Sequence, residues 1–222
     1  MQHLHLAAAD GRTAVLLQLL DGGVSADAPS PDGSGATALH AACCWGHSEA
    51  VELLLQRGAS VDARNGDSLT PLCLAASEGH ASCLSILLAN NATVDAADGT
   101  GKTALLWAAE NGKVEACKAL LEAGASVAAA DADGWTALHW ATLYDNVEVV
   151  SLLLAHGAAP AQPDAAGLTP AEAAQLEGDV KVQVEMQRFS AVESFRARGL
   201  EARGSETAAP APAAPGCSCV VQ

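Results

Sequence analysis

Aromatic and basic residues are both scarce in this chain. Phenylalanine, tryptophan and tyrosine make up 3% of its 222 residues, and 11 lysines and arginines face 26 aspartates and glutamates, which gives a formal net charge of −15. Because binding to nucleic acid needs clustered basic residues against the phosphates, no nucleic acid partner is expected. The excess of acid lies within residues 1–189. Few aromatic residues and abundant alanine favour closely packed small helices over a large aromatic core.

Long apolar runs, a secretory leader and paired cysteines are also missing. No apolar run approaches the ~18 residues of a transmembrane helix, and the opening MQHLHLAAADGR lacks the basic and apolar regions of a secretory signal. The 7 cysteines show no CxxC spacing, so free thiols in a reducing compartment are expected. A nucleophile elbow and an HExxH motif are absent, and GTGKT, which begins at Gly99, lacks the earlier glycine of a phosphate loop. The sequence therefore predicts neither an enzyme nor a bound cofactor.

A period of 33 residues dominates what the chain does contain. It is marked by five threonines, Thr37, Thr70, Thr103, Thr136 and Thr169. Threonine is a good N-cap and proline suits the first helical position, so each threonine predicts the start of a short helix. Glycines predict the end of this helix and of a second one, and the Asp- and Gly-rich link that follows predicts a β-hairpin finger. Since no single unit can bury its apolar face, neighbouring units must stack.

The recurring segments identify the type of repeat. ATALHAAC, LTPLCLAA, KTALLWAA and WTALHWAT, each followed by a second-helix segment such as SEAVELLLQRGASVDA, resemble the ankyrin repeat over about residues 2–189. The resemblance implies an all-α ankyrin-repeat solenoid of helix-turn-helix units with β-hairpin fingers. We place an N-terminal capping repeat at 1–30, full repeats at 31–63, 64–96, 97–129 and 130–161, a C-terminal capping repeat with an extended helix at 162–199, and a disordered tail at 200–222.

The extended helix has one apolar face. Val182, Met186 and Phe189 recur on it at helical spacing. The face either packs back on the solenoid as a cap or contacts lipid or a partner. Both alternatives remain open from the sequence.

The ankyrin resemblance implies a protein partner bound on a concave surface of finger tips and first helices. Positions that vary between repeats are the candidate contacts: Leu69, Lys102 and Trp135 in the fingers, and Trp45, Glu78, Asn111, Leu143 and Tyr144 at the ends of the first helices. Tryptophan and tyrosine are frequent interface hot spots, so Trp45, Trp135 and Tyr144 stand out. The alternative is that each ring lies flat on its own repeat, because large apolar groups are rarely left fully exposed. A monomer is expected.

A metal site is the competing interpretation of one segment. His40, Cys43, Cys44 and His47 fall close together and are of the types that bind zinc. A structural role is favoured, because the resemblance makes His40 and its counterpart His139 hydrogen-bonding plugs, and because free cysteine often serves as a small buried hydrophobe. No metal is therefore expected. In the fourth repeat Asp145 replaces the glycine of the inter-helix turn, which predicts a looser or distorted turn.

The chain ends in Cys-Val-Val-Gln after a segment rich in Ala and Pro. This ending resembles a prenylation box, with Cys219 as the prenyl acceptor and a terminal glutamine that favours farnesyl. Since a single lipid holds a protein to a membrane only marginally, Cys217 is the expected second site, by palmitoylation. These features predict a non-enzymatic adaptor tethered to the cytosolic face of a membrane. The alternative is a soluble, unlipidated regulatory protein of the cytoplasm or nucleus.

Overall fold

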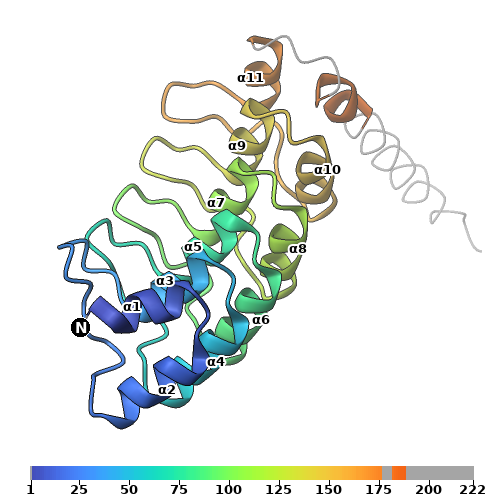
Figure 1. Ribbon diagram of the computed structural model, residues 1–222. Helices are drawn as coiled ribbons and strands as arrows, with labels where there is room; N and C mark the ends of the chain where they lie inside the picture. The colour runs from blue at the N-terminus through green and yellow to red at the C-terminus, as the bar shows by residue number, and fades with distance from the viewer. Residues whose placement is uncertain (1, 177–181, 189–222) are drawn as a thin grey trace, which may run out of the picture. The chain divides into compact units, whose positions relative to one another are not determined.

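The computed structural model describes residues 2–176 and 182–188. The chain divides into two units, Met1–Met186 and Gln187–Gln222, and all the repeats lie in the first. Within that unit, pairs of short helices follow one another at the 33-residue period (Figure 1). The tail at 200–222, with Cys217 and Cys219, lies outside the described residues.

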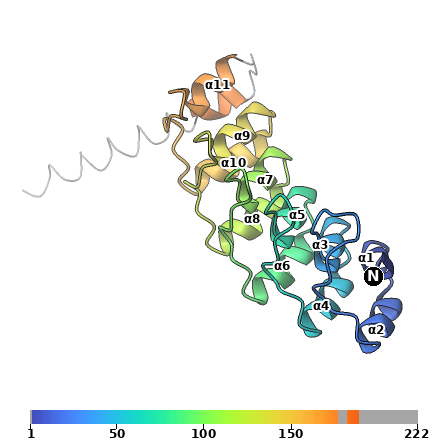
Figure 2. The same ribbon diagram turned by 90° about the vertical axis from the view of Figure 1, so that its left-hand side faces the viewer.

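The helices form two layers. The inner layer comprises α1 (Gln2–Ala9), α3 (Ala38–Cys44), α5 (Pro71–Glu78), α7 (Ala104–Glu110), α9 (Ala137–Leu143) and α11 (Pro170–Leu176). The outer layer comprises α2 (Thr13–Asp21), α4 (Ser48–Gln56), α6 (Ala81–Ala89), α8 (Val114–Glu122) and α10 (Val147–Ala155). Inner helices pack on inner helices and outer on outer, as both views show (Figures 1 and 2). The predicted all-α solenoid is confirmed.

The helix boundaries follow local sequence signals. The Thr70 hydroxyl accepts a hydrogen bond from the Cys73 amide (3.3 Å), Pro71 takes the first helical position, and Gly79 ends α5 with a φ of 83°. Asn91, which stands where other repeats have glycine, adopts a φ of 61°. In α5, threonine, proline and the left-handed glycine therefore act as the sequence predicts, whereas Thr103 precedes α7 without a side-chain capping bond.

The core lies between the two layers. Leucines 33 residues apart fill it from the inner helices (Leu39, Leu72, Leu105, Leu138) and from the outer helices (Leu54, Leu87, Leu120, Leu153), and all are at most 1% exposed. Burying one leucine stabilises the fold by roughly 1.5–3 kcal/mol. Since the helices that carry these leucines pack on the corresponding helices of neighbouring repeats, the same residue type recurs through the whole core.

A further helical segment covers residues 182–188. Val182 and Met186 are buried in it, and the Ser151 hydroxyl of α10 donates a hydrogen bond to Glu185 (3.0 Å). Phe189, which the sequence places on the same face, lies outside the described residues.

Candidate functional site: the concave surface

The fingers and the inner helices form one side of the solenoid, which we call the concave surface (Figure 1). Each finger reverses through a tight turn, as where the Asp98 amide donates to the Lys102 carbonyl (3.0 Å) and the Asp98 carboxylate accepts from the amides of Thr100 (2.8 Å) and Lys102 (3.0 Å). Asn65, Asp131 and Asp164 hold the corresponding finger turns. In the described part of the chain the only β-type pairing is an isolated antiparallel bridge between Ala130 and Thr136, so the fingers are held by turn bonds.

Neighbouring fingers are joined to each other through their backbones. Amides of one finger donate to carbonyls of the preceding one: Gly66 to Ser34 (2.7 Å), Gly99 to Asp67 (3.0 Å), Ala132 to Thr100 (3.0 Å) and Ala165 to Asp133 (2.9 Å). Gly134 sits against this ladder at a φ of 81°, where an added Cβ would lie 2.8 Å from the Ala165 amide nitrogen. The fingers therefore present a continuous, pre-ordered surface.

The histidines at the base of the fingers are structural. His40 Nδ1 accepts from the Thr37 amide (3.0 Å), so Nε2 carries the proton and donates to the Leu69 carbonyl of the next repeat (3.0 Å). His139 makes the same two contacts with Thr136 (3.1 Å) and Leu168 (3.2 Å). Both ring nitrogens are thus occupied, and a metal would have to displace these bonds.

The cysteines near His40, buried Cys43 and half-buried Cys44, are free thiols. Burial raises the pKa of the Cys43 and Cys44 thiols, and it raises that of Cys117 to about 12. His47, in the inter-helix turn, donates through Nε2 to the Ala9 carbonyl of the preceding repeat (2.8 Å). Among the described residues, no three histidine, cysteine or acidic side chains are arranged to hold a metal ion.

The two plug histidines predict how stability depends on pH. Burial is the main cause that lowers the pKa of both His40 and His139 below 6.5. Between that lowered value and 6.5 the unfolded chain binds more protons than the folded chain, so the free energy of unfolding rises with pH there, by at most ~1.4 kcal/mol per pH unit for each histidine. We expect urea unfolding to give a lower stability at about pH 5 than at about pH 7.5.

A leucine variant provides the control for this pH dependence. His139→Leu keeps a buried apolar group, as Leu106 does in the same position of the third repeat, and removes one titrating ring. The variant should reduce the rise of the free energy of unfolding between about pH 5 and pH 7.5. Some carboxylates, such as Asp98 and Asp164, have a pKa lowered below the ordinary value of 3.8. Their protonation affects stability only at lower pH, and so it does not contribute to the pH dependence attributed to the histidines. A slope that the variant does not change would contradict the assignment.

Four of the predicted contact residues form one exposed column. Trp45, Glu78, Asn111 and Tyr144 each follow or end an inner helix, 33 residues apart, and all four are exposed. Trp45 is 65% exposed and Tyr144 is 53% exposed, although the Tyr144 ring also stacks on Trp140 of its own repeat. The Asn111 amide group donates to Ser77 Oγ (3.3 Å) and to the Trp107 carbonyl (2.9 Å).

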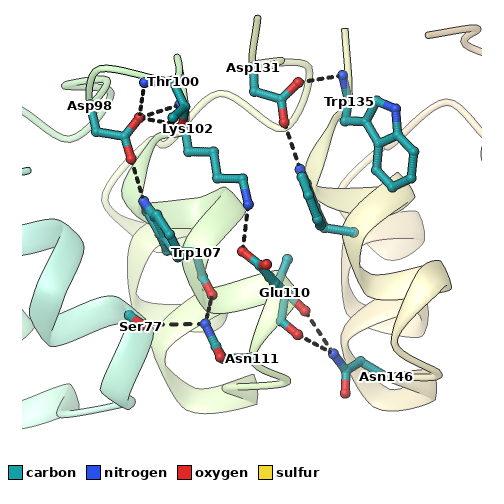
Figure 3. A network of polar contacts seen from close by, with 12 residues as sticks. Ser77, Asp98, Thr100, Lys102, Trp107, Glu110, Asn111, Asp131, Trp135 and Asn146 are labelled. Atoms are coloured by element: carbon teal, nitrogen blue, oxygen red, sulfur yellow. Dashed lines mark hydrogen bonds and ion pairs between the residues drawn. The ribbon is translucent and has the colours of Figure 1, made fainter. Parts of the chain in front are cut away.

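The other predicted residues lie deeper. Leu69, Trp135 and Leu143 are half-buried, while Lys102 is only 9% exposed. The Lys102 ammonium forms an ion pair with Glu110 (2.7 Å) (Figure 3). Lys102 therefore supports the concave surface from beneath, whereas the exposed column faces solvent.

Lys102 lies within a cluster that we call the aromatic cluster: Trp107, Trp135, Trp140 and Tyr144 together with Lys102. The ammonium is 3.4 Å from the ring centroid of Trp140 and 4.6 Å from that of Trp107. Trp135 lies against Trp140, with centroids 4.9 Å apart, and Tyr144 stacks on Trp140 at 6.3 Å and 10°. The cation–π contact between Lys102 and Trp140 thus joins the third and fourth repeats, and the ring contacts lie within the fourth.

Finger aspartates fix the two central indoles of the cluster. Trp107 Nε1 donates to Asp98 (2.9 Å), and Trp140 Nε1 donates to Asp131 (2.9 Å). Figure 3 shows each aspartate between its own finger turn and an indole. These bonds were not predicted from the sequence, although a signal for them exists: Asp98–Trp107 and Asp131–Trp140 share one spacing and recur 33 residues apart.

A hollow of about 440 Å³ lies at the other end of the exposed column. Leu6, Pro31, Ala41, Trp45 and Leu74 are among the residues that line it. Leu6 is 60% exposed beside it. The hollow extends the apolar part of the concave surface between α1 and α3.

The expected distortion of the fourth inter-helix turn is wrong. Asp145 adopts a φ of 53°, and the Asn146 amide nitrogen still donates to the Ala141 carbonyl (2.9 Å), as His47 and His80 do to their own inner helices. The Asn146 side chain donates to the Ala109 (2.9 Å) and Glu110 (3.0 Å) carbonyls of the preceding repeat. This side chain takes over the histidine's contact across repeats, and so the turn keeps its geometry.

Stacked helix-turn-helix units with ordered fingers define a repeat solenoid of the kind that presents a surface to a partner. A family model of three ankyrin repeats matches residues 1–65 and 62–131, and a single-repeat model matches residues 133–165. The chain belongs to the ankyrin repeat family.

The chain is also similar to an ankyrin repeat-containing protein of Schizosaccharomyces pombe. The two are 41% identical over 65 residues, which is 29% of this chain and 30% of the relative. The matched segment therefore spans about a third of that protein's length. Ankyrin repeats generally mediate protein–protein interaction. Among the described residues, no helix has both the length and the apolarity needed to cross a membrane.

Proposed function

We propose that this chain is a non-enzymatic adaptor that binds a protein partner on its concave surface. The observation that carries the proposal is the exposure of Trp45 (65%) and Tyr144 (53%) in one column. Folding alone gives no reason to leave two large rings in water, and such rings are frequent hot spots of interfaces. The joined fingers favour binding further, because a pre-ordered surface loses little entropy when a partner docks.

Site-specific photo-crosslinking tests this proposal. A photoreactive phenylalanine analogue at Glu78, in the exposed column, should cross-link a protein in cells, and Trp45→Ala with Tyr144→Ala should abolish the adduct. The matched control places the same analogue at Lys118, which is exposed on the outer helix α8. Equal cross-linking from both positions, or none from Glu78, would reject the concave surface as the binding site.

We further propose that Cys219 is prenylated and Cys217 palmitoylated, so that the adaptor is held at the cytosolic face of a membrane. The support is the sequence Cys-Val-Val-Gln with a neighbouring cysteine. The proposal requires Gln222 to carry the free carboxyl terminus. A prenyl group with one palmitoyl chain would anchor the protein stably, whereas one lipid alone would not.

Membrane fractionation with mass spectrometry of the C-terminal peptide tests the tether. Wild type should sediment with membranes, Cys219→Ser should be fully soluble, and Cys217→Ser should associate only weakly. The peptide mass should show the prenyl group. An unmodified peptide, with wild type and Cys219→Ser equally soluble, would favour the unlipidated protein of the cytoplasm or nucleus instead.

A further inference from the structure

We propose that the aromatic cluster, on its Tyr144 side, is a binding site for an arginine side chain, and that the protein partner docks through a basic segment. The inference rests on the proposed function, because it names the chemistry of the partner that the concave surface binds. Three features of the third and fourth repeats carry it: a rigid aromatic stack, a geometry that already holds a cation, and an unbalanced negative charge.

The aromatic stack is held in place before any partner arrives. Asp131 bonds the Trp140 indole (2.9 Å), Trp135 packs against one part of that ring, and Tyr144 stacks on it at an interplanar angle of 10°. Tyr144 remains 53% exposed at the end of this stack. An incoming planar group could thus extend the stack with little loss of side-chain entropy.

Lys102 shows that the cluster accommodates a cation. Its ammonium lies close to the faces of both Trp140 and Trp107 while it pairs with Glu110. The Trp140 ring therefore contacts both the Lys102 ammonium and the parallel Tyr144 ring. Tyr144 is the ring of this stack that is most exposed to solvent. Attraction between a cation and such a ring is typically worth a few-fold in affinity or more.

The charges around the cluster are not balanced. Asp98, Asp131 and Glu110 place three carboxylates there against the single ammonium of Lys102, and hydrogen bonds from Thr100 help to lower the pKa of Asp98. Arg64, the other basic residue in the described fingers and inner helices, is engaged with the carbonyls of Ser68 (3.2 Å) and Ala97 (2.7 Å). The concave surface thus attracts a basic partner, and this attraction is screened by salt.

Arginine fits these features better than lysine. Its guanidinium is planar and weakly hydrated and stacks on aromatic faces, so it can lie on Tyr144 while its N–H groups point toward the acidic fingers. A lysine ammonium is compact and strongly hydrated, and it gains less from an exposed ring. We therefore expect selectivity for arginine beyond the attraction of charge.

Synthetic peptides test the site directly. The probes are three peptides of one Gly-Ser sequence that carry arginine, lysine or citrulline at the same positions, titrated calorimetrically into the full chain at low and physiological salt. The arginine peptide should bind, the lysine peptide should bind about threefold more weakly, and the uncharged citrulline peptide should bind at least about tenfold more weakly. Equal binding of the arginine and citrulline peptides, or no detectable binding, would overturn the proposal.

Variants locate the binding on the stack. Tyr144→Ala should weaken the binding of the arginine peptide about fivefold or more, while Tyr144→Phe, which keeps the ring, should leave the affinity unchanged. Leu17→Ala, on the outer helix α2 and outside the concave surface, is the matched control and should also leave the affinity unchanged. In a separate Trp45→Ala background the tryptophan fluorescence comes from Trp107, Trp135 and Trp140 alone, and the arginine peptide should change that signal. An unchanged affinity in Tyr144→Ala would overturn the site.

The two proposals can fail separately. If Glu78 cross-links a protein but the arginine peptide does not bind, the concave surface still binds a partner and the assignment of a basic segment is wrong. If the peptide binds at Tyr144 but no protein cross-links at Glu78, the arginine site stands and the adaptor function is wrong.

Discussion

Leu105→Ala is expected to lower the free energy of unfolding by about 2–5 kcal/mol. Leu105 is fully buried in α7, which packs against α5 on one side and α9 on the other. Truncation leaves a cavity in the middle of the solenoid and weakens two inter-repeat interfaces at once. In a stack whose repeats contact only their neighbours, such a loss is not compensated elsewhere. Urea unfolding monitored by far-UV circular dichroism measures the change.

A second leucine serves as the matched control for this experiment. Leu6, on the inner helix α1, is 60% exposed, so Leu6→Ala should change the free energy of unfolding by no more than about 0.5 kcal/mol. If Leu105→Ala costs no more than Leu6→Ala, the third repeat does not carry the shared core that the structure describes.

Lys102→Met is expected to destabilise the protein by about 2–4 kcal/mol. The change removes the ion pair with Glu110, whose side chain is only 17% exposed, and the cation–π contacts with Trp107 and Trp140. Methionine fills most of the space but leaves a carboxylate without its counter-charge in a poorly solvated place. The measurement is again urea unfolding, with tryptophan fluorescence as a second signal from the aromatic cluster.

A double variant separates the charge effect from packing. With Glu110→Gln added, no charge is left without its partner, so the double variant should be more stable than Lys102→Met alone. Lys118→Met, on the exposed face of α8, should stay within about 0.5 kcal/mol of wild type. Simple addition of the two single effects would show that Lys102 and Glu110 are not coupled.

The sequence predicted the repeats well because their signals are local and recur in phase. Thr70 and Pro71 act at the start of α5 and Gly79 at its end, and a threonine precedes the inner helix at each 33-residue step. The plug role of His40 and His139 also followed from the motif, and the structure confirms both contacts. The distorted turn predicted at Asp145 is wrong, because the Asn146 side chain forms compensating hydrogen bonds to a different repeat.

The exposure of the candidate contact residues could not be predicted from the sequence. Lys102, Trp45 and Tyr144 are all candidates from the sequence, because all three positions vary between repeats. Only packing separates them: Lys102 is 9% exposed within the aromatic cluster, whereas Trp45 and Tyr144 face solvent. Exposure depends on what the neighbouring repeat places over a side chain, and a variable position carries no information on that.

By itself, the sequence determined the repeat type, the helix boundaries, the acidic charge and the lipidation hypothesis for Cys217 and Cys219. Each of these depends on residue types at fixed spacing, and so on the chemistry of a few adjacent residues. The tertiary structure alone decided which side chains are exposed, that Asp98 and Asp131 hold the indoles, and that Lys102 joins two repeats. These facts arise from contacts between units, whose distances and angles are fixed only when the repeats stack.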